Sequence, residues 1–438
     1  MNLVFLSFLK SKSLALFGVR VVGAVAVLLS NIVVMRYESS EVSGAFFVIY
    51  TLFQLGTIFS RFGADIYLVR EYYTLPLNNI QEYYSKSVAL TLILGGCLVP
   101  LLTALGYFYM ATWNKLSAVV VPIGDYAILL SIFAALPIFA ASSIIFFIYQ
   151  ARHKVITQIL GINVIQPWIF LAAYLCFKLS EYCGVSLNPS VGISIAFVGS
   201  VICYAVISMI LVQKAKLKLK LKPSLSYKTL NATAHRQLKY AIATMGTQLV
   251  GWVPYLLASY MLGPAFAAVF NILQRLAMLS SFISVSINSI SAPHIAQFAS
   301  QLDFKSIHKV FWSNTKKLMF LSSGYLLLLF LVVTYYDGFP DEFKTPAYIV
   351  LVGYFINCAT SVCGYYFQNA SKISILNASL YIVAFCSPVI TYVLLESLGM
   401  IGAALAIACA VAGVNGILFP LAVMDLNRRN ISSDVGHG

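Results

Sequence analysis

Twelve long apolar runs are the feature that most limits what this chain can fold into. A helix needs roughly 20 apolar residues to cross the hydrocarbon of a bilayer, whereas a barrel strand needs only about 10. Only 10% of the residues are charged, against about 25% in soluble domains. We therefore predict an all-α polytopic membrane protein with about 12 transmembrane helices. Their expected positions are about 13–35, 43–69, 86–109, 124–149, 156–178, 190–213, 238–261, 265–291, 315–335, 346–371, 374–396 and 400–424.

The Lys and Arg residues predict the orientation of these spans. If the N-terminus is cytoplasmic, 21 of the 28 basic residues fall in inside segments and four fall outside. Cytoplasmic loops of membrane proteins carry such an excess of Lys and Arg. Both termini are therefore expected in the cytoplasm. The net charge of +14 follows from this topology and gives no reason to expect nucleic-acid binding.

A lysine-rich stretch divides the spans into two sets of six. It begins KAKLKLKLK at Lys214, and contact of its lysines with anionic lipid head groups accounts for it. We expect an N-terminal lobe at 1–213, a basic cytoplasmic linker at 214–237, a C-terminal lobe at 238–424 and a cytoplasmic tail at 425–438. Because six is even, related lobes would have the same orientation in the membrane.

Motifs of enzymes and metal sites are absent from the sequence. There is no P-loop, no HExxH and no GxSxG, the five His are scattered, and the eight Cys form no CxxC. The expected outside loops are too short to hold a catalytic domain. The sequence therefore predicts a protein that is not an enzyme and that needs no metal or cofactor.

Three arginines lie within the expected spans, namely Arg20, Arg61 and Arg275. A charge at the bilayer centre costs on the order of 3 kcal/mol on insertion scales. The helical rise places Arg20 and Arg61 about 10 and 13 Å from the cytoplasmic ends of their spans, and Arg275 about 15 Å from the outer end of its span. One interpretation is that they snorkel to the interface or bind helices together. The other is a cationic, water-filled cavity, since the planar guanidinium suits phosphate oxygens.

Further polar side chains near these arginines are candidates for the same cavity. Asp65 follows Arg61 by four residues, a spacing that would place both on one helix face, so Asp65 is expected to pair with Arg61 or to couple transport to an ion. The expected cavity-lining residues are Asn271, Gln274, Asn163, Gln166 and Trp168.

Five segments, in order along the chain, stand out for their order and spacing: RVVGAVAVLLSNIVVMRYESSEVSGAFFV, FGADIYLVRE, WVPYLLASYMLGPAFAAVFNILQRLAML, SINSISAPHIAQFASQLDFKSIHKVFWSNTKKLMFLSS and LESLGMIGAALAIACAVAGVNGI. In this order they resemble the O-antigen flippases, the polysaccharide-exporting branch of the multidrug/oligosaccharidyl-lipid/polysaccharide exporter superfamily. One departure is the seventh span, where many relatives carry an acid and this chain reads QLVGWVPY.

The resemblance implies a fold and a substrate class. It implies two six-helix lobes in a MATE-like V that opens alternately to each side of the bacterial inner membrane. It also implies that polyprenyl-diphosphate-linked oligosaccharides cross to the periplasmic leaflet, with polymerase and chain-length proteins of the same pathway as partners. The cavity arginines of related lipid-linked precursor flippases correspond here, by residue type and span, to Arg20, Arg61 and Arg275.

Three other functions stay open at the level of sequence. A membrane polymerase or glycosyltransferase of the same pathway would be expected to have a sizeable extramembrane loop or domain. A drug or cation antiporter of the same superfamily would be expected to have acids in its cavity. A flippase for another lipid-linked precursor would have the same sequence features as an O-antigen flippase.

Overall fold

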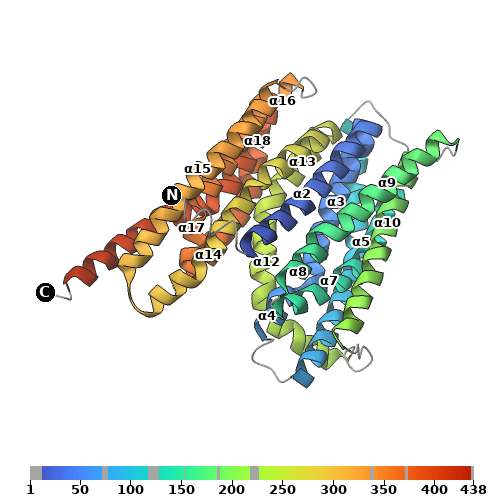
Figure 1. Ribbon diagram of the computed structural model, residues 1–438. Helices are drawn as coiled ribbons and strands as arrows, with labels where there is room; N and C mark the ends of the chain where they lie inside the picture. The colour runs from blue at the N-terminus through green and yellow to red at the C-terminus, as the bar shows by residue number, and fades with distance from the viewer. Residues whose placement is uncertain are drawn as a thin grey trace. The chain divides into compact units, whose positions relative to one another are not determined.

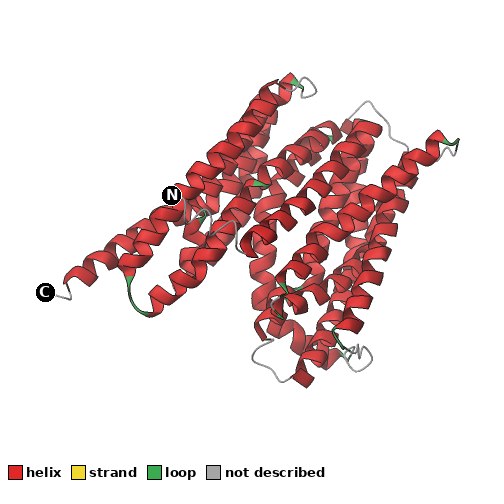
Figure 2. Ribbon diagram, in the orientation of Figure 1, coloured by secondary structure: helices red, strands yellow, loops and turns green. Residues whose placement is uncertain are grey.

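The computed structural model describes residues 12–71, 77–116, 128–152, 154–184, 188–217, 226–335, 340–369 and 373–435. In this part of the chain every regular element is a helix, and there is no strand (Figure 2). Eleven of these helices are long and apolar enough to cross a membrane. The chain is therefore a multi-pass membrane protein, and the predicted all-α class is confirmed.

The last of the eleven, α18 (Ile373–Val435), contains two passes. Gly399, with φ 55° and ψ −130°, is not helical. A Cβ atom on Gly402 would lie 1.8 Å from the carbonyl oxygen of Leu394. Two residues eight positions apart in one continuous helix would be separated by about 12 Å along the axis. The chain therefore reverses at Gly399, and the described residues contain twelve passes when α18 is counted as two.

The helices fall into two compact units, which we describe separately. The N-unit comprises Leu14–Gln248 with Gly263–Ala268, and the C-unit comprises Leu249–Leu262 and the chain from Val269 onwards. The division falls inside α12 (Tyr227–Leu262). This helix begins within the segment expected to be a linker, of which residues 218–225 lie outside the described part of the chain.

The N-unit is organised around α3 (Ser40–Arg61), which packs against α5 and α7 (Figure 1). Sixteen of the 22 residues of α3 are buried, which is why its polar side chains bond back to its own backbone, as Thr51 Oγ1 does to the Phe47 carbonyl at 2.8 Å. Aromatic rings fill the centre, with Phe53 and Phe197 edge to face at 5.0 Å. The other helices of this unit are α2 (Lys12–Tyr37), α4 (Ala64–Glu71), α5 (Leu77–Leu116), η1 (Ser131–Ala135), α7 (Leu136–Ala151), α8 (Val155–Ile159), η2 (Leu160–Ile165), α9 (Gln166–Tyr182) and α10 (Pro189–Lys214).

Three spans expected as single helices are interrupted. The one expected at 346–371 breaks at Ser361, between α16 (Asp341–Thr360) and α17 (Val362–Asn369). The span expected at 43–69 breaks after Arg61, because Phe62 (φ 47°) and Gly63 (φ 75°) adopt left-handed conformations. Glycine is needed at position 63, since a Cβ there would also lie 2.4 Å from the backbone nitrogen of Ala241. The span expected at 265–291 is interrupted at Leu279, between α13 (Pro264–Met278) and α14 (Ser280–Ser300).

A close approach of two backbones within the N-unit predicts a steric effect at Gly44. A Cβ on Gly44 would lie 2.3 Å from the carbonyl oxygen of Pro264, so α3 and the start of α13 must separate to admit it. We expect Gly44→Ala to destabilise the protein by about 1–3 kcal/mol, as measured by thermal unfolding of the purified protein. Gly96→Ala on α5 is the matched control, because a Cβ there meets nothing within 4 Å. An equal effect of the two substitutions would contradict this prediction.

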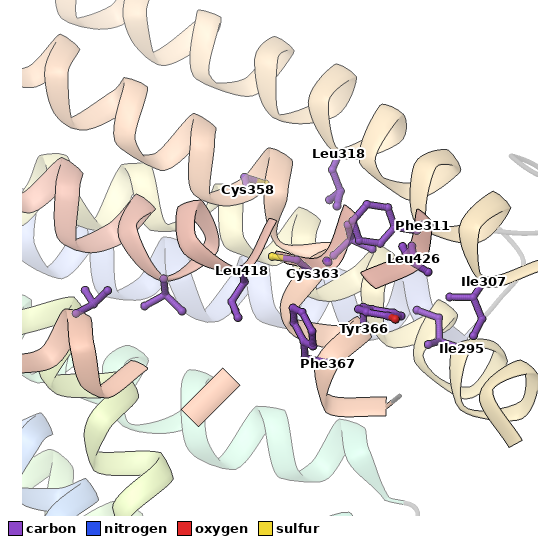
Figure 3. Packing of buried hydrophobic residues seen from close by; sticks show 14 of the residues in the cluster. Ile295, Ile307, Phe311, Leu318, Cys358, Cys363, Tyr366, Phe367, Leu418 and Leu426 are labelled. Atoms are coloured by element: carbon purple, nitrogen blue, oxygen red, sulfur yellow. The ribbon is translucent and has the colours of Figure 1, made fainter. Parts of the chain in front are cut away.

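The C-unit has its own apolar core, formed where α14, α15 (Phe304–Tyr335), α17 (Val362–Asn369) and the second half of α18 meet. Figure 3 shows Phe311, Tyr366 and Phe367 together in this core, and the rings of Tyr366 and Phe367 lie 5.2 Å apart. The helix α16 (Asp341–Thr360) packs against α15 and α18.

Outside the membrane spans, Asp303 caps the N-terminus of α15. Its Oδ1 accepts a hydrogen bond from the Ser306 backbone N–H at 3.0 Å. Hydrogen bonds from Ser306 lower the pKa of the Asp303 carboxyl, which stays ionised at the positive end of the helix.

Candidate functional site

Arg275 lies in the last turn of α13 within a cluster of aromatic and amide side chains of the C-unit. Its Nε donates to Asn271 Oδ1 at 2.8 Å, one helical turn earlier. Its Cζ lies 5.5 Å from the centre of the Trp252 ring on α12. A helix C-terminus favours a cation, and so does an aromatic face. The side chain itself is half-buried.

A second set of hydrogen bonds holds the residues that surround Arg275. Asn271 is fully buried and its Nδ2 donates to the Tyr255 hydroxyl at 3.3 Å. Gln274 Nε2 donates to the carbonyl oxygen of Gly251 at 3.0 Å, in the turn of α12 that Pro254 interrupts. Both predicted lining residues of α13 are therefore buried: Asn271 supports the arginine directly, and Gln274 joins α13 to α12.

Arg61 is the last residue of α3 and lies inside the N-unit with 8% of its surface exposed. Its Cζ is 5.2 Å from the centre of the Phe147 ring on α7. Tyr204 on α10 is fully buried and close enough to interact electrostatically with the guanidinium. Among the described residues, no acceptor bonds to the buried Arg61 Nε.

The expected pairing of Arg61 with Asp65 is wrong. The left-handed residues Phe62 and Gly63 end α3, so the two side chains do not share a helix face. No ion pair joins them in the described part of the chain. Asp65 is 9% exposed and its Oδ1 accepts from the Ile66 backbone N–H at 2.9 Å. It therefore stays a candidate only for the other expected role, ion coupling.

The remaining predicted residues lie elsewhere in the N-unit. Arg20 is half-buried on α2, three residues before Gly23, whose Cβ would lie 2.5 Å from the Asn163 carbonyl oxygen. Asn163 is exposed and belongs to the π-helical turn η2, a distortion that is frequent at functional sites. Gln166 is 3% exposed and donates to Ser200 Oγ at 3.0 Å, so it joins α9 to α10. Trp168 is 39% exposed.

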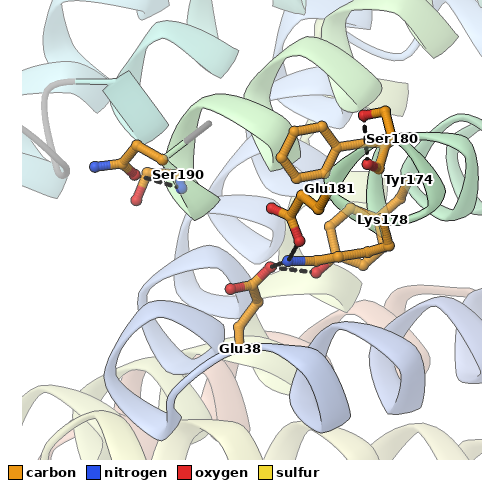
Figure 4. Close-up of polar contacts among 8 residues, drawn as sticks. Glu38, Tyr174, Lys178, Ser180, Glu181 and Ser190 are labelled. Carbon is orange, nitrogen blue, oxygen red and sulfur yellow. Dashed lines mark hydrogen bonds and ion pairs between the residues drawn. The ribbon is translucent and has the colours of Figure 1, made fainter. Parts of the chain in front are cut away.

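A buried network of charges was not predicted from the sequence (Figure 4). Glu38, between α2 and α3, forms an ion pair at 2.7 Å with Lys178 on α9, and their side chains are 2% and 8% exposed. Lys178 also pairs with Glu181 at 3.1 Å, and the Tyr174 hydroxyl donates to Glu38. We call these four residues the Glu38 network. It ties the connection between the first two spans to the fifth.

Sequence reasoning also missed the aromatic residues that hold the arginines. Trp252 and Tyr255 lie in the segment QLVGWVPY, noted above only because an acid is missing there. Phe147 lies in an apolar run among other aromatic residues and Tyr204 lies in an apolar run with few of them, and nothing in either local pattern distinguishes these two residues. These aromatic residues could have been found by a search for Phe, Tyr and Trp in the spans predicted to pack beside each arginine.

The geometry gives both arginines a setting suited to an anionic ligand. An aromatic face and a helix C-terminus stabilise a guanidinium without neutralising it. At Arg61 no carboxylate competes for the charge, because no ion pair involves it among the described residues. Guanidinium groups in such surroundings bind phosphate oxygens with strong, charge-assisted hydrogen bonds.

No family model matches the chain, and no curated protein sequence matches it. Solved membrane transporters nevertheless share its architecture over almost the whole length. An inward-facing multidrug resistance MATE family transporter of the MOP superfamily has 12% identity and a TM-score of 0.68, over 95% of this chain and 96% of that one. The lipid II flippase MurJ, in an inward closed conformation, has 16% identity and a TM-score of 0.61, over 97% and 90%.

A third similar structure is a MOP superfamily transporter from Pyrococcus furiosus, for which reverse polarity of the binding pocket suggests a different function. It has 13% identity and a TM-score of 0.63, over 96% of this chain and 99% of that one. These neighbours are transporters and flippases, not enzymes. The chain has the fold of the MOP superfamily transporters.

Proposed function

We propose that the protein is a flippase for polyprenyl-diphosphate-linked oligosaccharide repeat units of O-antigen or a similar surface polysaccharide. It would move them from the cytoplasmic to the periplasmic leaflet by alternating access. The fold supports transport, since the solved proteins that share it include a multidrug transporter and a lipid II flippase. The buried Arg61 guanidinium, stacked on Phe147 and paired with no carboxylate in the described residues, carries the proposal.

The chemistry of the cargo accounts for the cations. A diphosphate loses its hydration when it enters the low-dielectric interior, at a cost that only opposite charge and hydrogen bonds offset. We propose that Arg20, Arg61 and Arg275 supply these bonds during translocation while most of the prenyl chain stays in lipid. An antiporter for cationic drugs would bind better at carboxylates, so the arginines favour an anionic cargo.

We also propose a location and partners for the protein. We place the protein in the bacterial cytoplasmic membrane with both termini in the cytoplasm, as the distribution of Lys and Arg favours. The polymerase and chain-length proteins of the same pathway would take the unit after it has crossed. Asp65 is the candidate for coupling the movement to a proton or sodium ion.

A deletion strain tests this function directly. We expect complete lipid-linked oligosaccharides to accumulate in lipid extracts while long surface polysaccharide disappears from gels of the same cells. The wild-type gene on a plasmid is the control and should restore both. A strain that builds no complete unit would make the protein an assembly enzyme. Single units on the surface without long chains would make it a polymerase, and either result overturns the proposal.

A further inference from the structure

An apolar groove of about 680 Å³ lies between α15 and α16 of the C-unit, within the roughly 300–1,000 Å³ of typical ligand pockets. We call it the α15–α16 groove. Its walls run from Phe320 to Phe330 on α15 and from Tyr348 to Phe355 on α16. Phe320 is 80% exposed and Val352 is 58% exposed, so the groove opens outwards from the unit, where a membrane protein meets lipid chains.

A glycine leaves room inside this groove. Gly324 is one of the lining residues, and a Cβ atom on it would meet nothing within 4 Å. At one end the rings of Phe330 and Tyr348 stack at 4.4 Å, and the Tyr348 hydroxyl is 2.9 Å from Thr334 Oγ1. The groove thus has two stacked rings at one end and, at Gly324, a space that no side chain fills.

The groove shares its walls with the Arg275 cluster. The hydroxyl of Tyr325, a groove residue, donates to the carbonyl oxygen of Leu276 at 2.7 Å, and Leu276 directly follows Arg275. Tyr354 on α16 is 4% exposed and lies beside Gln274 and Arg275, while its neighbour Phe355 lines the groove. A cationic cluster and an apolar groove are therefore adjacent within the C-unit.

This juxtaposition matches a ligand with an anionic head and an apolar chain. We propose that the α15–α16 groove holds the isoprene units closest to the diphosphate when the diphosphate is at Arg275. The inference rests on the proposed function, and it names the part of the protein that receives the polyprenyl chain. Lipid chains are as apolar as the groove. On entering the groove from lipid, the polyprenyl chain therefore gains mainly packing contacts and orientation.

Photochemical labelling identifies directly which residues contact the polyprenyl chain. The full-length protein in lipid nanodiscs is irradiated with a polyprenyl diphosphate that carries a diazirine on an isoprene unit near the diphosphate. We expect adducts within residues 320–330 and 348–355, and we expect excess unlabelled polyprenyl diphosphate to remove them. Adducts that persist under this competitor but disappear with excess phospholipid would make the groove a phospholipid site and overturn the inference.

Filling the groove separates chain binding from head-group binding. We expect Gly324→Phe to weaken the long-chain probe about fivefold, because only packing contacts are lost, and to leave a second probe, inorganic diphosphate, unaffected because it has no isoprene unit. Gly199→Phe on α10 is the matched control, since its Cβ position is equally open. Arg275→Ala should weaken both probes.

The two hypotheses fail in different ways. If Gly324→Phe leaves the long-chain affinity and the adducts unchanged while Arg275→Ala weakens both probes, the groove inference is wrong and the proposed function stands. If the wild-type protein binds neither probe, the proposed function fails and takes the inference with it.

Discussion

Arg275→Ala is expected to reduce surface polysaccharide by about 10-fold to 100-fold, because a hydrogen bond to a charged group contributes about 1.5–3 kcal/mol. The substitution removes the cation but leaves the ring of Trp252 and the amide of Asn271 in place. The measurement is polymer length and amount on gels of a complemented deletion strain, with the membrane level of the variant checked by immunoblot.

Two companion variants show whether the guanidinium itself matters. Arg275→Lys keeps the charge and loses the planar fork, so we expect export between that of the wild type and that of Arg275→Ala. Arg36→Ala is the control, since Arg36 is an exposed arginine in the last turn of α2. Normal export by Arg275→Ala at a normal protein level would remove Arg275 from the substrate site.

Lys178→Met is expected to destabilise the protein by about 3–5 kcal/mol, the usual cost of removing one partner from a buried ion pair. The Glu38 side chain, 2% exposed, would lose its partner at 2.7 Å and, among the described residues, keep the Tyr174 hydroxyl alone. Thermal unfolding of the purified protein measures the loss. The double variant Glu38→Gln/Lys178→Met should recover part of it, since no uncompensated carboxylate then remains at position 38.

A surface ion pair of the same chemistry provides the comparison. Lys344 pairs with Asp341 at 2.7 Å, but the Asp341 side chain is 92% exposed. Lys344→Met should cost less than about 1 kcal/mol, because water screens and replaces the interaction. If Lys178→Met and Lys344→Met had equal effects, the Glu38 network would not be a stabilising element.

The spans were predictable because lipid imposes a length and an apolar composition on each one. Even the reversal at Gly399 falls between the runs expected at 374–396 and 400–424. Hydropathy, however, identifies the part of a helix that lies in the bilayer and not the polar turns that extend beyond it. For this reason the polar first turns of α12, from Tyr227, were assigned to a linker.

For the candidate site, the arginines could be predicted from the sequence, but the side chains that contact them could not. Intramembrane arginines stand out in any sequence with few charges. Their supports depend on contacts between helices, such as that of Arg61 with Phe147, 86 positions further along the chain. The spacing of Arg61 and Asp65 misled because one left-handed residue followed by glycine redirects the chain between them. The Glu38 network joins residues about 140 positions apart, so no local pattern reveals it.

The separation of Arg61 from Asp65 has a kinetic consequence. An anion that approaches an arginine already paired with a carboxylate must first break that pair, and in a low-dielectric interior this adds to the barrier. At Arg61 the guanidinium lies over the Phe147 ring, on the last residue of α3, and neither the ring nor the helix leaves when a ligand arrives. Under the proposed function, binding and release of the diphosphate at Arg61 would therefore require no exchange of ion-pair partners. A carrier that must release its cargo on the far side in every cycle benefits from such a contact.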